Sequence, residues 1–319
     1  MVNKMRKSKK RRIVLGILAL LLIVIGVVAY FGIDVALRTQ KLFEEIHEEV
    51  VTDNVREEQD LPPVVLGETP FSVLIMGIDN DFPGDPGRAD SLMLATVNPN
   101  TDTTYLLSIA RDTMVVINGR TTRINHAHAY AGGGVAGAQA TINVVQDFLN
   151  VPIDYYVSLQ EDGFGDLIDA VGGVRVYNDT VAFAMGGHNF SMGYNDLNGD
   201  AALAFARMRM EDPRGDFGRQ QRQRLVIGAM VDELAGVGVI TRYQDVMAAA
   251  GDHLRTDVSA NEAMTISLGY NRALRNITNL NLQATGGIFP EFGGMYLIPI
   301  PEEQRLEMSV RLRNHLELD

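Results

Sequence analysis

The chain has 319 residues, with 28 Lys and Arg against 40 Asp and Glu, and it contains no cysteine. The missing cysteines exclude a thiol nucleophile, a thiolate metal site and a disulfide. The net charge of −12 opposes non-specific binding to nucleic acid, whose phosphates attract basic surfaces. A hydrophobic content of 46% is typical of a packed protein, and the length suits one large domain or two ordinary ones.

The amino terminus has the pattern of a membrane anchor. Residues 1–12 hold seven cations and no acid, and residues 13–33 are 21 uncharged, mostly apolar residues. A helix of that length spans about 30 Å, the thickness of a bilayer's hydrocarbon core. A cleavable signal peptide is the alternative, but Tyr30, Phe31 and Ile33 stand where small residues should precede the cleavage site. We therefore expect one transmembrane helix, with a cytoplasmic tail before it and the rest of the chain outside the cell.

Residues 34–69 have the composition of a stalk. Their first half suits a polar helix, and Leu61-Pro62-Pro63 ends any helix that reaches it. We expect this segment to be an extracellular spacer without chemistry.

Residues 70–319 alternate strand and helix patterns. Short apolar runs predict strands at 71–76, 91–97, 104–109, 154–159 and 174–177. Longer periodic segments predict helices at 136–149, 164–171, 199–206 and 219–234. Residues 98–102 form a turn signal, so the second and third strands should make a hairpin. Residues 241–319 are expected to continue in helices and loops. The whole predicts one layered α/β domain with a mixed central sheet.

An acidic loop follows the first predicted strand. Asp79 ends the strand, and Asp81, Asp85 and Asp90 follow among glycines and prolines. Carboxylates presented from a strand end suit a hard cation, so Asp79 and Asp90 are candidate ligands of Mg²⁺. A calcium loop is excluded because Pro83 takes a ligand position and a strand, not a helix, comes before it. An acidic surface loop without a metal is the alternative.

A basic cluster lies in residues 207–224. Six of the 19 arginines that follow Lys41, the last lysine, gather there: Arg207, Arg209, Arg214, Arg219, Arg222 and Arg224. Guanidinium groups bind phosphate oxygens in pairs, so four converging arginines suit a pyrophosphate. The four arginines expected to converge are Arg207, Arg209, Arg219 and Arg222. Gln223 is expected beside Arg219 on the predicted helix at 219–234 and would join them. Surface ion pairs with neighbouring acids are the alternative.

Two further arginines flank the acidic loop. Arg88 precedes Asp90 by two residues, and Arg111 follows the strand that ends at residue 109. Either could place a guanidinium beside the carboxylates. The pair His126 and His128 is a weak metal signal, and a loop position beside three glycines is the preferred interpretation.

The order of these motifs resembles the LytR-CpsA-Psr family from about residue 70 to the carboxyl terminus. The motifs are, in chain order, Gly77-Ile78-Asp79, Arg88 to Ser91, Ser108 to Asp112, Arg123 to Ala127, Asp169 to Val174, Leu197-Asn198-Gly199, Arg207-Met208-Arg209 and Gly215 to Gln223. The basic tail, single span and external domain match the family's architecture. Two departures are Ala110, where the family usually has proline, and Asn80, where serine and arginine usually follow the aspartate.

The resemblance implies a fold and a reaction. The fold is an α/β/α domain that holds a polyprenyl chain in an apolar tunnel. The reaction moves a glycopolymer, wall teichoic acid or capsular polysaccharide, from undecaprenyl pyrophosphate to peptidoglycan as a phosphodiester at the cell membrane of a Gram-positive bacterium.

Phosphoryl transfer depends mainly on positioning and charge neutralisation, which suggests roles for the charged residues. Arg207, Arg209, Arg219, Arg222 and Gln223 would hold the pyrophosphate, and Asp79 and Asp90 would bind Mg²⁺. The remaining charge on the reacting groups would be stabilised by Arg88 and Arg111. Asp90 is also a candidate to accept the proton of the acceptor hydroxyl.

Other functions remain open at this point. A transcription attenuator is opposed by a cytoplasmic segment of about 12 residues, too short for a helix-turn-helix. A non-catalytic polyprenyl-phosphate-binding protein and a lipid pyrophosphatase would share the same phosphate-binding residues.

Overall fold

The computed structural model describes residues 37–50, 55–80, 84–234 and 239–318. The chain divides into two compact units, residues 1–45 and 46–319. The predicted tail at 1–12 and the predicted span at 13–33 lie outside the described residues. Within the part that is described, residues 37–46 are helical, and no helix is both long enough and apolar enough to cross a membrane.

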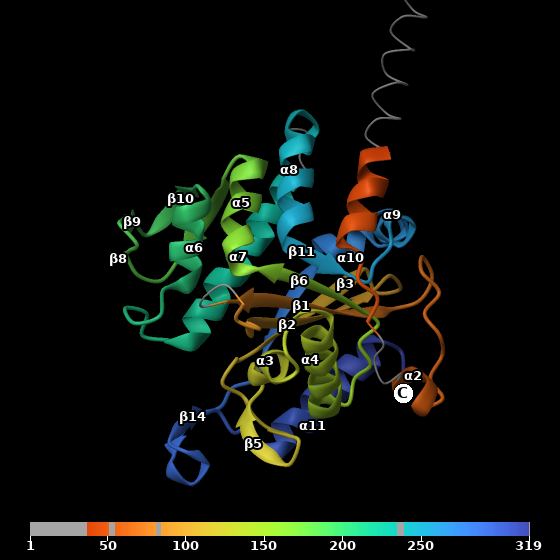
Figure 1. Ribbon diagram of the computed structural model, residues 1–319, viewed down its shortest axis with the longest axis vertical. Coiled ribbons are helices and arrows are strands. Elements are labelled where there is room, and N and C mark those ends of the chain that lie inside the picture. Colours follow the sequence, from red (N-terminus) through yellow and green to blue (C-terminus); the bar gives the residue numbers. More distant parts are fainter. Residues whose placement is uncertain (1–36, 51–54, 81–83, 235–238, 319) are drawn as a thin grey trace, which may run out of the picture. The chain divides into compact units, whose positions relative to one another are not determined.

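A six-stranded mixed sheet forms the centre of the second unit (Figure 1). Its order is β11 (Leu254–Thr256), β6 (Tyr155–Gln160), β1 (Phe71–Asp79), β2 (Arg88–Asn98), β3 (Thr103–Ile109) and β12 (Ile277–Asn281). β1 runs parallel to β6, and β3 runs parallel to β12, whereas the other pairs are antiparallel. The predicted hairpin of β2 and β3 is present. The sheet is therefore mixed, as the sequence indicates.

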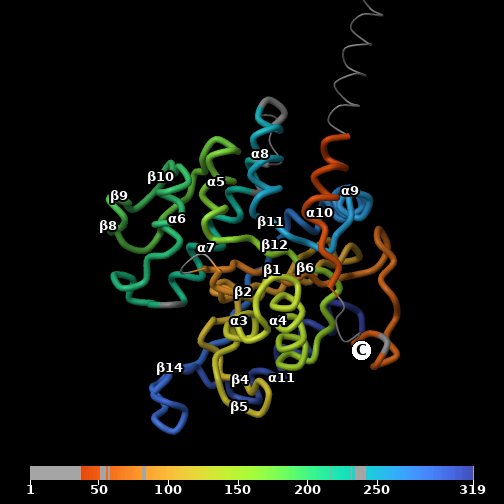
Figure 2. Tube along the Cα trace, viewed as in Figure 1, coloured from red at the N-terminus to blue at the C-terminus, as the bar shows by residue number. Residues whose placement is uncertain are grey.

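Helices cover both faces of this sheet. One face is covered by α3 (His126–Tyr130), α4 (Gly134–Leu149) and α11 (Glu302–His315), and the other by α5 (Glu161–Val171), α6 (Gly199–Arg207), α7 (Asp216–Leu234) and α8 (Val239–His253) (Figures 1 and 2). Alternation along β1 explains the two faces, because Leu74, Met76 and Ile78 enter the core beside α4. Ile75, Gly77 and Asp79 point to the opposite side.

Local signals define the ends of these helices. Asn198 caps α6 by accepting a hydrogen bond from the backbone N–H of Ala201. Asn150 caps the end of α4 and Gly172 caps the end of α5, both in the left-handed conformation that asparagine and glycine tolerate. α9 (Ala260–Gly269) begins with a capping box of Ser259 and Glu262.

Residues 241–319 contain more strand than we expected. Both β11 and β12 join the central sheet, one at each edge. β12 exposes most of its side chains, so its sequence lacks the apolar run that marks an inner strand. The expectation of helices and loops alone was therefore wrong for this segment. Its other elements are α10 (Asn271–Arg275), η1 (Pro290–Phe292) and the pair β13 (Gly287–Phe289) and β14 (Met295–Leu297).

Three more two-stranded pairs surround the sheet. They are β4 (Met114–Ile117) with β5 (Arg120–Arg123), β7 (Val174–Asn178) with β10 (Gly193–Leu197), and β8 (Phe183–Met185) with β9 (His188–Phe190). The inner side of β7 and β10 packs with α6 and α7 in a second core, centred on Phe205. This core supports the helices that carry the basic cluster.

Described residues between 46 and 69, in the segment assigned to a stalk, contact the domain directly. His47 pairs with Thr256 beside β11, and Arg56 of α2 (Val55–Glu58) forms a largely buried ion pair with Asp154. The hydroxyl of Tyr270 donates to the carbonyl of Thr69 at 2.6 Å. These contacts place residues 46–69 in the same compact unit as the sheet.

Candidate functional site

A cavity of about 350 Å³ lies between the sheet and the layer of α5, α6 and α7. Three neighbouring strands line it, and along each of them the side chains change from apolar to polar in one direction. Rows across the strands, from the apolar end, are Met93–Ile75–Val157, then Ser91–Gly77–Leu159, then Asp90, Asp79 and Glu161. The cavity thus has an apolar end and a charged end, which we call the mouth.

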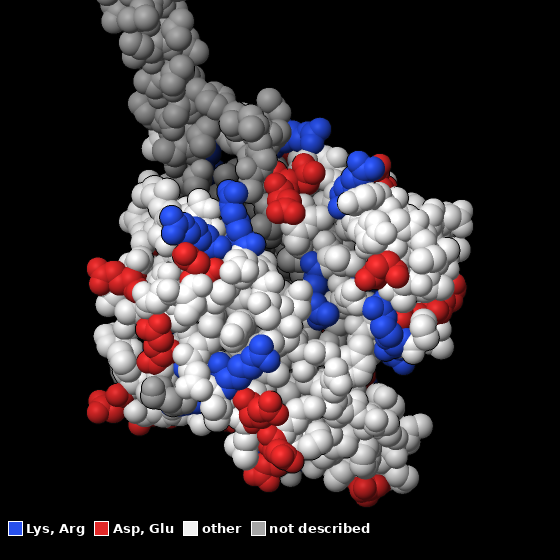
Figure 3. Space-filling model, turned by 180° about the vertical axis from the view of Figure 1, so that it is seen from behind, with Lys and Arg blue, Asp and Glu red and all other residues white. Residues whose placement is uncertain are grey.

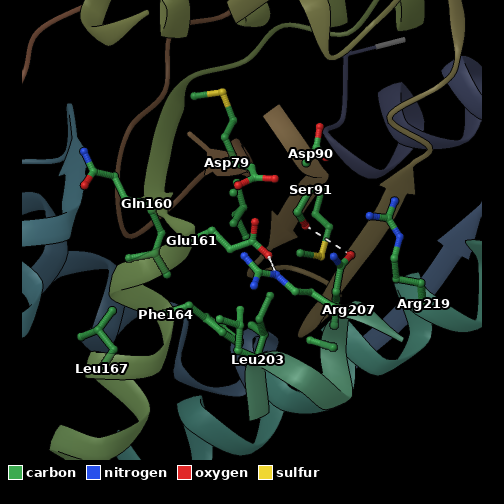
Figure 4. A pocket seen from close by; sticks show the side chains of 18 of the residues that line it. Asp79, Asp90, Ser91, Gln160, Glu161, Phe164, Leu167, Leu203, Arg207 and Arg219 are labelled. Atoms are coloured by element: carbon green, nitrogen blue, oxygen red, sulfur yellow. Dashed lines mark hydrogen bonds and ion pairs between the residues drawn. The ribbon is translucent and has the colours of Figure 1, made fainter. Parts of the chain in front are cut away.

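The helices over the cavity repeat the same order. One face of α7 presents, at helical spacing, Arg219, Gln223, Ile227 and Met230. α5 begins at the mouth with Glu161 and continues with Phe164 and Leu167. α6 approaches from the other side, with Leu203 and Ala206 before Arg207. Figure 4 shows Asp79, Glu161 and Arg207 close together, with Phe164, Leu167 and Leu203 to one side of them.

A β-bulge presents Asp90 at the mouth. Gly77 pairs with Ser91, but the next residue of β1, Ile78, pairs with Ala89. Asp90 is therefore an extra residue in β2 and lines the cavity together with Asp79. Bulges redirect side chains in this way beside functional sites. This places the two predicted carboxylates in one cavity.

Glu161 is a third carboxylate of the mouth, and no pattern in the sequence predicted it. Burial, the charge of Glu161 and a hydrogen bond with it, and then the charge of Asp90 raise the pKa of Asp79 to about 6, against a smaller opposing effect of Arg207. The signal in the sequence that could have identified Glu161 was its position at the start of a helix, directly after β6. That signal becomes informative only once β6 is known to lie beside β1.

Three arginines of the basic cluster line the mouth. Arg207, Arg209 and Arg219 do so together with Gln223, which accepts a long hydrogen bond of 3.4 Å from Ser91. Arg207 donates to Glu161 at 2.5 Å, and this bond raises the pKa of the arginine despite its partial burial. All three side chains are therefore within the same cavity as the carboxylates.

Arg222 lies elsewhere, so the expectation that it joins the converging arginines is corrected. Its side chain is 4% exposed and does not line the cavity. The guanidinium donates to Asp212 at 2.5 Å, to the carbonyl of Phe205 at 3.1 Å and to the carbonyl of Met208. Arg222 lies on the face of α7 that packs against α6, so it stabilises the contact between these two helices.

The two flanking arginines differ in position. Arg111 lines the mouth, where it donates to Asp90 Oδ2. Arg88 is exposed, pairs across the strands with Asp79 through the backbone, and does not line the cavity. Asp81 lies outside the described residues. His128 is buried with Nδ1 3.1 Å from the carbonyl oxygen of Gly87, which fits a structural residue, but it lies in the short helix α3 and not in a loop as the sequence predicted.

The oxygen donors of the mouth fit a hard cation in part. Asp79 and Asp90 lie together, and the pKa of Asp79 is raised first by burial and then by the nearby carboxylates of Glu161 and Asp90, whose negative charge a divalent cation would neutralise. Among the described residues, no group of three or more His, Cys, Asp or Glu side chains is arranged to hold a metal ion. Magnesium often takes one or two carboxylates and completes its shell with water and substrate phosphates.

The charges of the mouth contrast with the outer surface. On the face seen in Figure 3, acidic and basic side chains are scattered among uncharged residues. The mouth instead brings four arginines next to three acids around one cavity: Arg111, Arg207, Arg209 and Arg219 with Asp79, Asp90 and Glu161. Such a site suits a ligand that carries several negative charges.

Comparison with known proteins gives consistent matches. The sequence matches the LytR_cpsA_psr family over residues 32–313. It is 38% identical over 313 residues to the polyisoprenyl-teichoic acid–peptidoglycan teichoic acid transferase TagU of Halalkalibacterium halodurans, which covers 97% of this chain and 99% of the relative.

Solved structures are also similar. The crystal structure of Bacillus subtilis TagU matches with a TM-score of 0.62 and 36% identity, over 79% of this chain and 99% of that one. A structure described as TagT bound to LIIa-WTA matches with a TM-score of 0.64 and 26% identity, over 80% of this chain and 94% of that one.

Proposed function

The chain belongs to the LytR-CpsA-Psr family, and on this basis we propose that it transfers wall teichoic acid from an undecaprenyl pyrophosphate carrier to peptidoglycan. The name of the relative, a teichoic acid transferase, favours this cargo over a capsular polysaccharide. The product is a phosphodiester at the 6-hydroxyl of muramic acid, and undecaprenyl phosphate is released.

One observation carries the proposal, namely the shared direction of polarity in six of the elements around the cavity. Three strands and three helices each place apolar side chains at one end and charged or polar ones at the other. A lipid pyrophosphate has the same division, with an apolar chain joined to a strongly anionic group. The apolar end, which includes Ile227 and Met230, would form a tunnel for the part of the polyprenyl chain next to the pyrophosphate.

The arginines of the mouth have the chemistry to hold the pyrophosphate. Arg207, Arg209 and Arg219 would bind its oxygens, with Gln223 donating a further hydrogen bond. Arg111, held by Asp90, is placed to stabilise charge that develops as the acceptor oxygen bonds to phosphorus and the bridging oxygen leaves. We assign no contact with the donor to Arg222, because its guanidinium is already engaged in the core.

Asp79 and Asp90 are the residues that would hold Mg²⁺. When bound, the ion would supply charge neutralisation on the pyrophosphate. The chain's own contribution is to present both carboxylates at the mouth, with Arg207 and Arg219 across from them and Arg111 paired with Asp90. The proton of the acceptor hydroxyl passes to a carboxylate of the mouth, for which Asp90 is our candidate.

A membrane anchor fits this reaction. The apolar run at residues 13–33, with its seven preceding cations, would hold the protein by one span with the domain outside the cell. The donor lipid lies in the outer leaflet of the same membrane. The domain would then act at the surface where peptidoglycan is assembled in a Gram-positive bacterium.

The experiment is a transfer assay with the purified full-length protein in detergent, a lipid-pyrophosphate-linked teichoic acid donor and peptidoglycan. We expect polymer bound to peptidoglycan and release of lipid phosphate that requires the acceptor. Lipid phosphate released equally without peptidoglycan would indicate a pyrophosphatase. Donor binding without turnover would indicate a binding protein, and either result would overturn the proposal.

A further inference from the structure

Asn125 holds the carboxylate of Asp90 from outside the cavity. The asparagine lies directly before α3 and is 3% exposed. Its Nδ2 donates to Asp90 Oδ1 at 2.7 Å, while Arg111 donates to Oδ2. Because an ionised carboxylate only accepts hydrogen bonds, the amide nitrogen and not the amide oxygen must face Asp90. Two donors therefore hold the two oxygens of this one side chain.

Helix capping does not explain the orientation of Asn125. Asparagine is favoured before a helix because its oxygen accepts a backbone N–H of the first turn. α3 has no such side-chain cap, and among the described residues no donor reaches the buried Oδ1 of Asn125. A buried oxygen without a donor lowers stability. The side chain of Asn125 therefore does not cap the helix, and its hydrogen bond to Asp90 determines its orientation.

The bulge in β2 makes this support necessary. A bulged residue has no partner opposite it in the ladder, so the sheet alone does not determine the direction of the Asp90 side chain. The two supporting residues are tied to each other, because the backbone N–H of Asn125 donates to the carbonyl of Arg111 at 3.3 Å. They come from the segments after β3 and after β5, so the tertiary structure assembles this support.

We propose that Asn125 is a positioning residue for the transfer reaction, which holds the Asp90 carboxylate toward the mouth of the cavity together with Arg111. The inference rests on the proposed function, since Asp90 acts there. Asn125 itself does not line the cavity. Its effect on the reaction therefore passes entirely through Asp90.

A double-mutant cycle tests this route. Asn125→Ala should lower kcat about 10- to 100-fold, with the KM for the donor changed less than about twofold. In an Asp90→Asn background the same substitution should change the residual rate less than about threefold, because the residue through which it acts is already altered. Independent losses that multiply in the double variant would overturn the inference.

Binding of Mg²⁺, measured by titration calorimetry without donor, gives a second readout. We expect Asn125→Ala to weaken it by about 10- to 100-fold. Asn125→Asp keeps the volume and replaces the donor with a second carboxylate that repels Asp90, so it should lower the rate at least as much. This isosteric variant also serves if the alanine variant fails to fold.

Asn98 is the matched control. It is also a buried asparagine, but its side chain donates to the carbonyl of His315 and to Glu317. Neither of these two partners lines the cavity. Asn98→Ala should lower Tm and leave kcat per folded molecule unchanged, whereas Asn125→Ala should keep Tm within about 3 °C. An Asn125→Ala variant with the parental rate, in a parent that transfers, would overturn this inference alone. A parent that neither transfers nor binds Mg²⁺ would overturn the proposed function and the inference with it.

Discussion

Arg219 and Arg222 lie three residues apart on α7, and we expect their replacement by alanine to impair different properties of the protein. Arg222 is enclosed by the contact between α6 and α7, where it donates to Asp212 and to two backbone carbonyls. Arg219 lines the mouth of the cavity. Arg222→Ala should therefore destabilise the fold, and Arg219→Ala should remove transfer from a folded protein.

The structure sets the size of the two effects. Arg222→Ala removes one of two arginines that pair with the fully buried side chain of Asp212, and it leaves the carbonyls of Phe205 and Met208 without this donor. Breaking a buried ion pair costs about 3–5 kcal/mol, and since Arg214 still pairs with Asp212 we expect about 3 kcal/mol. Arg219→Ala should cost about 2–4 kcal/mol of transition-state stabilisation, which is roughly 30- to 1,000-fold in rate.

Urea unfolding followed by circular dichroism measures the first effect, and transfer per folded molecule measures the second. Arg222→Met is the control, because it keeps most of the side-chain volume and removes only the polar contacts. We expect it to lose nearly as much stability as Arg222→Ala. An Arg222→Ala protein within about 1 kcal/mol of the parent, or an Arg219→Ala protein with the parental rate, would refute the reasoning.

Three further predictions concern the metal, the lipid and the pH. Asp79→Ala should abolish the response of transfer to Mg²⁺, and a chelator should silence the parent; full parental activity in chelator would remove the metal role. Ile227→Trp should fill the apolar end of the cavity and lower kcat/KM about tenfold for a long polyprenyl donor, and less for a three-isoprene donor; equal losses would contradict a tunnel. Burial lowers the pKa of His315 from 6.5 to about 4, so the unfolded state binds this proton more tightly and stability should fall as pH drops below 6.5, by about 2–3 kcal/mol at pH 4.5. His315→Gln should flatten this part of the curve in urea unfolding at each pH, and an unchanged slope would show that other groups cause it.

Short-range patterns in the sequence determined most of the elements and the chemistry of the site. Apolar runs predicted β1, β2, β3 and β6, because inner strands must present unbroken apolar stretches to two layers, and alternating apolar residues predicted β7, which has one buried face. Helical periodicity predicted α4 to α7 within a few residues. The order of charged motifs indicated a pyrophosphate and named residues, including Asp79, Asp90 and Arg219, that the fold brings to one cavity.

Only the tertiary structure decided which neighbours those residues have. Helical spacing places Arg219 and Arg222 within reach of one face, but the packing of α6 on α7 buries one guanidinium and leaves the other at the mouth. Glu161 joins the carboxylates because β6 pairs with β1 across some 80 residues of chain, and Asn125 reaches Asp90 because a bulge turns that side chain out of the ladder. Strand pairing and helix packing depend on contacts far apart in sequence, whereas propensity and periodicity record only the residues within a few turns.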